Sequence, residues 1–285
     1  MGVRACRENP CLGRAEPVAS GGRLLVVTAE TDEQRTQREQ RRVLFGGVAE
    51  LYDATRQSYP AEIVEAILAT AAVGGGAAVL EIGCGTGQLT RQVAGRGLKV
   101  TAIDISGAMI AAARRNVADR MVWFQACSFE DFAGSGPFDL IVSGTAFHWV
   151  DPGIGWAKAA RLVRPGGWLA LLSTGESYPE PLRTRLRELW IRYNHKTGTW
   201  ADQPGWVTVL RETSLFGTPV EARHTRALRL PVETIMGVER TRATFLGLSE
   251  NDQASFSADL TTLLTASSHI DLAQETLLAM APVTS

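Results

Sequence analysis

A glycine-rich segment is the first feature of the sequence with an evident chemical use. Residues 81–87 read Glu-Ile-Gly-Cys-Gly-Thr-Gly and close the apolar run 77–82. Glycine lets the chain turn sharply and lets the backbone approach a ligand without a Cβ in between. The next apolar run ends at Asp104, where a carboxylate can accept both ribose hydroxyls of an adenine nucleoside. The two features together predict a site for an adenine-containing ligand.

The order of the glycines helps to identify the kind of adenine-containing ligand. Nicotinamide dinucleotide sites carry Gly-x-Gly-x-x-Gly, which needs a glycine at position 88, and Gln88 stands there. The observed order is Gly83-x-Gly85-x-Gly87, with Glu81 suited to holding a backbone amide or a positively charged group. A nicotinamide-dependent oxidoreductase is the alternative, and a turn that binds no ligand is a second one.

Strands and helices must alternate around this turn. Apolar runs predict strands over 77–82, 98–104, 121–126, 138–143 and 168–173. Helices are predicted over 61–72, 86–95, 106–118 and 152–163, and Ser106 is a plausible N-cap for the third of them. Such alternation predicts an α/β fold, in which a parallel sheet carries helices on both faces.

The chain divides into four predicted parts. Residues 1–29 are expected to form a disordered tail, and residues 30–45 a charged helical arm that is either solvated or exchanged between subunits. Residues 46–178 form the ligand-binding core. Residues 179–285 add a helical lid over about 181–266, which includes a strand at 220–230, and a last segment, 269–280, that the sequence leaves open between strand and helix.

The composition limits the function classes. The chain has 285 residues, 45% of them hydrophobic, which is enough for a buried core. A net charge of −1 provides no basic excess, so we expect no nucleic-acid and no membrane partner. No apolar run approaches a membrane span or signal peptide, and the four cysteines fit neither a zinc pattern nor a disulfide framework. We therefore expect a cytoplasmic protein without a metal.

Further motifs give the sequence a family resemblance. Residues 79–89, Ile103-Asp104, and the segments 138–143 and 162–167 resemble, in order and spacing, the motifs of class I S-adenosylmethionine (SAM)-dependent methyltransferases. Residues 45–53 and the Ala-Phe-His-Trp segment 146–149 resemble a branch with many small-molecule methyltransferases of natural-product pathways. The resemblance covers about residues 40–175 well.

This resemblance implies a fold and an activity. The expected fold is Rossmann-like, a doubly wound, mostly parallel seven-stranded sheet with the last strand antiparallel, plus a helical lid insertion. The expected activity is transfer of a methyl group from SAM to a small-molecule acceptor in secondary metabolism. A non-catalytic SAM-binding module is a further alternative, and a homo-oligomer joined through the 30–45 arm is a possible assembly.

The resemblance also implies a cofactor site. Gly83, Gly85 and Gly87 should wrap the methionine part of SAM, Glu81 should orient that loop and the amino group, and Asp104 should hold the ribose. The remaining expected contacts are Ile105, Ser128 and Phe129 around the adenine, Ser143 and Gly144 at the methionine end, and a flap of Tyr52, Arg56 and Tyr59 that could instead be a packing loop. Family members often carry aspartate where this chain has Cys127, so the adenine amine is expected on backbone, Glu130 or Asp131.

The acceptor side is expected to be aromatic. His148 follows the fourth strand near the expected methyl group, where it could be a general base, an acceptor-positioning group or a structural hydrogen-bonding residue. Aromatic side chains that could line the acceptor pocket, or pack the lid on the sheet, are Phe147, Trp149, Trp190, Tyr193, Trp200 and Trp206.

Overall fold

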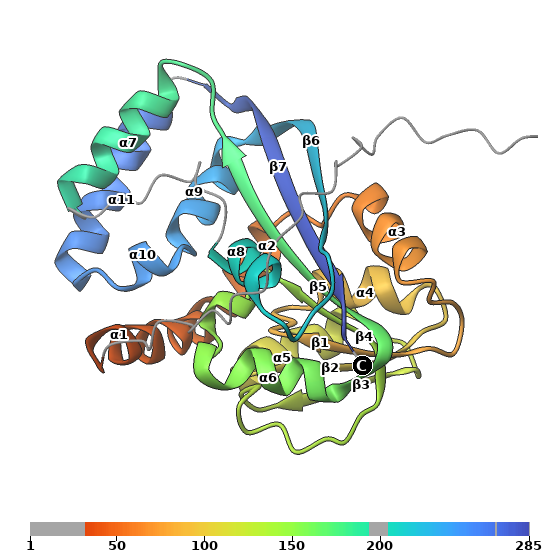
Figure 1. Ribbon diagram of the computed structural model, residues 1–285. Helices are drawn as coiled ribbons and strands as arrows, with labels where there is room; N and C mark the ends of the chain where they lie inside the picture. Colours follow the sequence, from red (N-terminus) through yellow and green to blue (C-terminus); the bar gives the residue numbers. More distant parts are fainter. Residues whose placement is uncertain (1–31, 194–204, 266, 285) are drawn as a thin grey trace, which may run out of the picture.

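A twisted sheet of seven strands runs through the computed structural model, which describes residues 32–193, 205–265 and 267–284 (Figure 1). The strands are β1 (Ala78–Ile82), β2 (Lys99–Asp104), β3 (Val122–Ala126), β4 (Phe138–Gly144), β5 (Val163–Ser177), β6 (Val220–Pro231) and β7 (His269–Pro282). Their order across the sheet is β3-β2-β1-β4-β5-β7-β6. Strand β7 runs antiparallel to both neighbours and the other adjacent pairs are parallel, which confirms the predicted fold class.

Helices cover both faces of the sheet. On one face, α3 (Ala61–Thr70), α4 (Gln88–Ala94) and α5 (Gly107–Asn116) bury apolar side chains against Val79, Val100 and Leu140. On the other face, α6 (Pro152–Leu162) and α8 (Gly205–Glu212) cover Leu80 and Ile141. Successive residues of a strand point to opposite faces, so each central strand contributes to both cores.

Local sequence signals explain where these elements begin. The Ser106 hydroxyl accepts the backbone N–H of Met109 at 3.2 Å and caps α5, as predicted. Helix α6 begins after Asp151, whose carboxylate accepts the N–H of Gly153 at 2.8 Å, and has a proline in its first turn. Segment 269–280, which the sequence left open, is part of strand β7, which pairs antiparallel with both β5 and β6.

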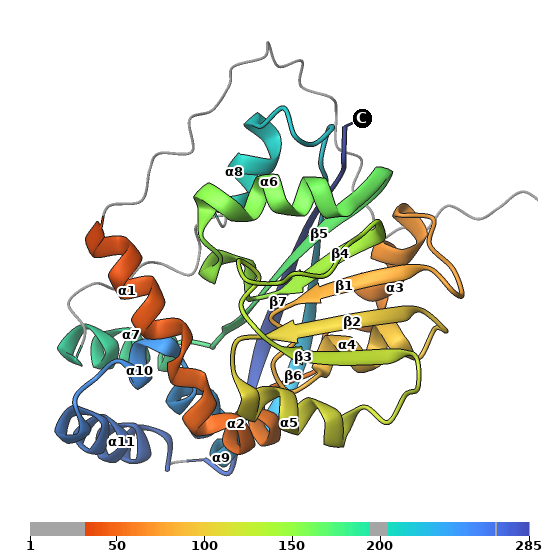
Figure 2. The same ribbon diagram turned by 90° about the horizontal axis from the view of Figure 1, so that it is seen from below.

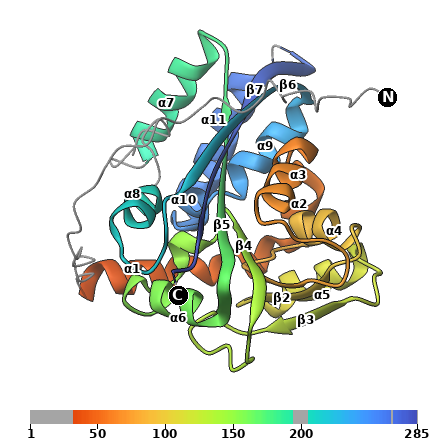
Figure 3. The same cartoon turned by 45° about the vertical axis from the view of Figure 1, so that its right-hand side comes forward.

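Three long strands carry a separate layer of helices. Strands β5, β6 and β7 extend beyond the rest of the sheet, toward α7 (Leu182–Tyr193), α9 (Val232–Arg240), α10 (Ala243–Leu246) and α11 (Glu250–Leu264) (Figure 3). These helices enclose a third apolar core that includes Ile235, Phe256 and Leu260. They form a lid layer, whereas α8, from the same part of the chain, packs on the sheet.

The N-terminal helices lie across the end of the sheet at which β1 and β2 finish (Figure 2). They are α1 (Asp32–Arg42), the 3-10 helix η1 (Leu44–Val48) and α2 (Ala49–Thr55). Helix α1 contacts α10 and the 3-10 helix η2 (Phe147–Trp149) of its own chain. Within the described ranges, no helix is long and apolar enough to span a membrane.

Candidate active site

The turn between β1 and α4 depends on its glycines. Gly83, Gly85 and Gly87 have φ angles of +70°, +54° and +91°, a region that L side chains rarely adopt. A Cβ on Gly83 would lie 2.2 Å from the Cβ of Ala146, which follows β4. The turn therefore lies directly against the chain after β4, and the absence of side chains keeps this contact close.

Asp104, the last residue of β2, holds the same turn. Its Oδ2 accepts the backbone N–H of Gly85 at 3.0 Å, and its Oδ1 accepts the N–H of Ser106 at 2.8 Å. Burial raises the pKa of Asp104, and these two N–H groups oppose the rise. The carboxylate thus joins the ends of β1 and β2 at one edge of the sheet.

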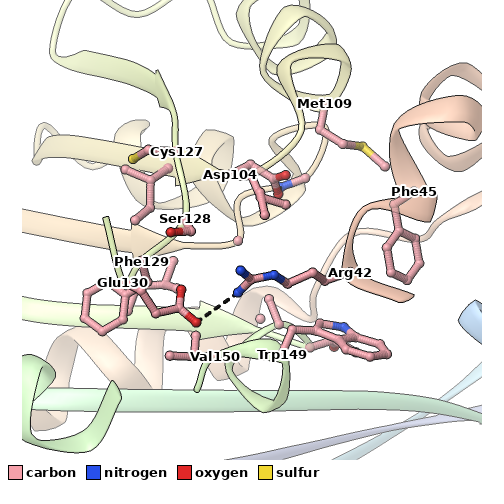
Figure 4. Close-up of a pocket in the computed structure, with 18 of the residues that line it drawn as sticks. Arg42, Phe45, Asp104, Met109, Cys127, Ser128, Phe129, Glu130, Trp149 and Val150 are labelled. Atoms are coloured by element: carbon pink, nitrogen blue, oxygen red, sulfur yellow. Dashed lines mark hydrogen bonds and ion pairs between the residues drawn. The ribbon is translucent and has the colours of Figure 1, made fainter. Parts of the chain in front are cut away.

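A pocket opens at this edge (Figure 4). It lies where ligands of open α/β sheets bind, outside the carboxyl ends of the strands. The predicted site residues that line it are Tyr52, Gly83, Gly85, Asp104, Ile105, Ser128, Phe129, Gly144 and Trp149. Glu130, one of the two acids considered for the adenine amine, also lines it. So do residues that were not assigned from the sequence, namely Arg42, Phe45, Ile82, Ile103, Met109, Cys127, Thr145, Ala146 and Val150.

Glu81 lies behind the glycine turn and does not line the pocket. Its side chain is buried, and its Oε2 has no hydrogen-bond partner among the described residues. Burial raises the pKa of Glu81 to about 8, and the nearby Asp104 carboxylate acts in the same direction. A buried carboxylate oxygen without a donor is costly, so this group fits a site that receives a cationic or N–H-bearing ligand.

Two other predicted cofactor residues, Gly87 and Ser143, lie near the pocket without lining it. Gly87 begins α4 and packs against Val117 and Ala113. Ser143 is buried, and its hydroxyl donates to the carbonyl of Ile82 at 2.8 Å. Ser143 therefore ties β4 to β1, so its contribution to the site is to position the glycine turn.

The predicted flap is close to the pocket but only one of its residues reaches it. Tyr52 lines the pocket, and the guanidinium of Arg56 lies 5.0 Å from the Tyr52 ring centroid. Tyr59 covers Gly144, where an added Cβ would lie 2.4 Å from the tyrosine oxygen. The Tyr59 hydroxyl lies 3.3 Å from the Thr145 hydroxyl, and burial raises the pKa of Tyr59.

The two acids expected near the adenine lie in different places. Ser128 donates its hydroxyl to Asp131 at 2.6 Å, and Asp131 does not line the pocket. Glu130 does line the pocket, and its Oε1 accepts the N–H of Asp151 at 2.9 Å. Of the two acids considered for the adenine amine, only Glu130 faces the pocket.

The three side chains of the Phe147–Trp149 turn lie in different environments. Phe147 is buried, with its ring centroid 4.8 Å from that of Trp156. Trp149 lines the pocket, and its ring lies 6.0 Å from that of Phe45. His148 lies beside Trp149, with 4.6 Å between ring centroids, and its side chain is exposed although surrounding protein atoms lower its pKa to about 4. The imidazole is therefore neutral at physiological pH.

The aromatic residues assigned to the acceptor pocket are spread over two cores. Trp190 donates to Glu239 at 3.0 Å and Tyr193 donates to Asp259 at 2.9 Å, and both rings pack against Phe256 in the lid. Trp206 is buried on α8 against the sheet. None of the three lines the pocket, and Trp200 lies outside the described residues.

Arg42 and Phe45 are the most informative residues that the sequence reasoning did not assign to the site. Phe45 is the first residue of the segment 45–53, which carries the pattern Phe-Gly-x-x-Ala-x-x-Tyr-Asp and was noted above for its family resemblance. The Phe45 and Tyr52 rings contact each other edge to face, with 6.3 Å between centroids. Arg42 had no comparable signal, because it is one of many charged residues in the arm.

Comparisons with known proteins agree with this geometry. Residues 80–171 match the family model described as a methyltransferase domain. An uncharacterized methyltransferase of Mycobacterium tuberculosis is 34% identical over 128 residues, covering 45% of this chain and 51% of that protein. A ubiquinone biosynthesis O-methyltransferase of Thiobacillus denitrificans is 37% identical over 99 residues, covering 33% of this chain and 43% of that protein. The chain thus spans about half the length of the curated relatives it matches.

A solved structure extends the comparison to the fold. It is described as a type II methyltransferase from Anaeromyxobacter dehalogenans and has a TM-score of 0.55 and 20% identity, covering 80% of this chain and 97% of that one. At this identity the likeness concerns the fold. The match over residues 80–171 supports a methyltransferase domain in this segment, and the solved structure agrees with the fold.

Proposed function

We propose that this protein transfers the methyl group of SAM to a small-molecule acceptor. The observation that carries the proposal is the position of Asp104, which lines the pocket and also holds the Gly85 N–H. An acid at this position beside a glycine turn suits a ribose, and Gln88 stands where a dinucleotide site would need glycine.

The residues present fit SAM in several ways. Gly83 and Gly85 leave backbone open to the pocket, which suits the close approach of the methionine part. Glu81 offers a buried, unpartnered carboxylate oxygen behind that turn, which suits the amino group through a small shift or a bridging water. Ile105, Met109 and Phe129 provide apolar walls on the adenine side. Bound SAM would supply an activated methyl group on a sulfonium.

The chain's own part in the reaction is to align the acceptor and exclude water. Phe45, Tyr52 and Trp149 form an aromatic wall on one side of the pocket. Such a wall suits an acceptor with a planar or apolar part, and natural-product intermediates of secondary metabolism have this character. The relative from Thiobacillus denitrificans, named for ubiquinone biosynthesis, agrees with an acceptor of this kind.

His148 is the candidate for proton removal from the acceptor. Its imidazole is neutral, and its side chain is exposed beside Trp149, which lines the pocket, although His148 itself does not. The lowered pKa makes the ring a weak base. A neutral imidazole accepts a proton without first losing one, so it can serve an acceptor hydroxyl, amine or acidic carbon.

The test is SAH (S-adenosylhomocysteine) formation from SAM in a coupled assay with separate pools of acceptors. One pool contains phenols, amines and carboxylic acids of low molecular mass, and the others contain proteins and nucleic acids. We expect SAH formation to depend on a member of the first pool and to be lost in Asp104→Ala. SAH formation that depends only on protein or nucleic acid would contradict the small-molecule assignment.

A further inference from the structure

Helix α1 is attached to the rim of the pocket by Arg38. The Arg38 side chain is only 7% exposed, and its Nη1 donates to the carbonyl of Trp149 at 3.3 Å. Its Nη2 lies 3.5 Å from Oδ2 of Asp151, and its Nη1 lies 3.7 Å from Oε1 of Glu130. One side chain of α1 thus contacts Trp149 and Glu130, which line the pocket, and Asp151 beside them.

Arg42, one helical turn further along α1, enters the pocket itself. Its Nη1 donates to Oε1 of Glu130 at 2.9 Å. Figure 4 shows the Arg42 side chain stretched from α1 to Glu130, with Asp104 and Ser128 on one side of it and Trp149 on the other. In this view the Arg42–Glu130 pair lies between Asp104 and Trp149, and all four residues line the pocket.

This ion pair is sheltered from water. The side chains of Arg42 and Glu130 are 19% and 14% exposed, which is much less than for the Arg192–Asp259 pair of the lid, at 66% and 40%. Partly buried ion pairs are screened less by solvent and salt than exposed ones. Separating Arg42 from Glu130 therefore costs more free energy than separating an exposed pair such as Arg192–Asp259, and this cost opposes movement of α1 away from the pocket.

Phe45, in the segment that follows α1, connects the side chains of the aromatic wall. The Phe45 ring packs edge to face against both Tyr52 and Trp149. Arg42, Phe45 and Tyr52 precede the segment 80–171 that matches the methyltransferase domain, so part of the pocket lining comes from outside the matched segment.

We propose that α1 is a strap across the cofactor pocket, and that the Arg42–Glu130 ion pair is the latch whose opening limits exchange of SAM and SAH. The inference rests on the proposed function, because it names the molecules that exchange. A closed latch covers the bound molecule, and separation of Arg42 from Glu130 frees the path between Asp104 and Trp149. Breaking the pair should accelerate both entry and exit.

The test measures SAH association and dissociation rates by stopped-flow fluorescence in the full chain. Arg42→Met keeps the length and apolar stem of the side chain but removes the charge. Glu130→Gln removes the charge from the other end and keeps an acceptor for the Asp151 N–H. Arg192→Met, which breaks an exposed ion pair of the lid, is the matched control. We expect both rates to rise on the order of tenfold in the first two variants, equivalent to about 1.4 kcal/mol of barrier, and to stay at wild-type values in the control.

Salt provides a second measurement on the same proteins. Raising NaCl from about 0.05 M to about 0.5 M should accelerate exchange in the wild type by much less than the Arg42→Met substitution does, because a partly buried pair is screened only weakly, and should have no effect in Arg42→Met, where the pair is absent. Wild-type rates in both latch variants would overturn the strap. A rise in dissociation with unchanged association would also overturn it, because Arg42 would then be a simple ligand contact. Absence of SAH binding in the wild type would instead contradict the proposed function.

Discussion

The Oδ2 atom of Asp104 lies 3.0 Å from the backbone nitrogen of Gly85 and accepts its hydrogen bond. The acid that ends β2 therefore fixes the turn that follows β1. The second carboxylate oxygen accepts the N–H of Ser106 at the start of α5. A single side chain thus sets the relative positions of two strand ends and one helix, and it also lines the pocket.

Replacement of Asp104 should separate its two roles. Asp104→Ala removes both acceptors and the ribose contact, so we expect SAH affinity to fall by roughly a hundredfold, the scale of a lost charge-assisted pair of hydrogen bonds. Asp104→Asn keeps one acceptor oxygen and should retain more of the thermal stability than of the affinity. Calorimetric titration with SAH and thermal unfolding check both effects. Unchanged SAH affinity in Asp104→Ala would exclude Asp104 from the cofactor site.

Gly83→Ala should destabilise the turn. Its φ of +70° disfavours any L side chain, and the new Cβ would lie 2.2 Å from that of Ala146. We expect the free energy of unfolding to fall by about 2 kcal/mol or more, together with a loss of SAH binding. Gly107→Ala is the control, because α5 begins there with no atom within 4 Å of the added Cβ. Equal melting temperatures of the two variants would show that the turn tolerates a side chain.

Glu81 should make stability depend on pH. Its pKa of about 8 in the folded protein exceeds the ordinary value of 4.5, so the folded chain binds the proton more tightly than the unfolded chain. The contribution of Glu81 to the free energy of unfolding therefore falls as pH rises from 4.5 to about 8, and is constant above. Glu81→Gln should remove this dependence, and Glu50→Gln, at an exposed position, should not. Denaturant titrations at a series of pH values measure it. Parallel pH profiles of wild type and Glu81→Gln would contradict the burial argument.

His148 should act as a neutral group across the physiological range. Because its pKa is lowered from 6.5 to about 4, no rate transition from this residue is expected between about pH 5 and pH 8. Once an acceptor is known, His148→Ala should lower kcat by at least about a hundredfold if His148 is the base, with SAH affinity unchanged. Full turnover in His148→Ala would remove the base role. A transition near 6.5 that disappears in His148→Asn would show that the ring titrates normally.

The core of the fold was predictable from the sequence because its signals are local. The strand ending at Ile82, the glycine turn, the Ser106 cap and the strand ending at Asp104 all follow from apolar runs and residue types. The glycines and Asp104 therefore came together in the structure as expected. Segment 269–280 could not be assigned locally, because pairing with β5 and β6 determines its strand conformation.

The rest of the site depends on contacts between distant parts of the chain. Trp190 and Trp206 are both tryptophans of the same part of the chain, yet Trp190 packs in the lid and Trp206 packs on the sheet. Arg42 reaches Glu130 across 88 positions, and no periodicity in a charged helix indicates such a pair. Residue type predicted that aromatic side chains would be buried, but only the tertiary arrangement shows which of them face the pocket.

Isothermal titration of the 285-residue chain with SAH, and separately with NADH, tests the central assignment most directly. The account predicts binding of SAH at one site per chain, lost in Asp104→Ala and retained in the surface control Asp259→Ala, with no heat of binding for NADH. Binding of NADH without binding of SAH would contradict it.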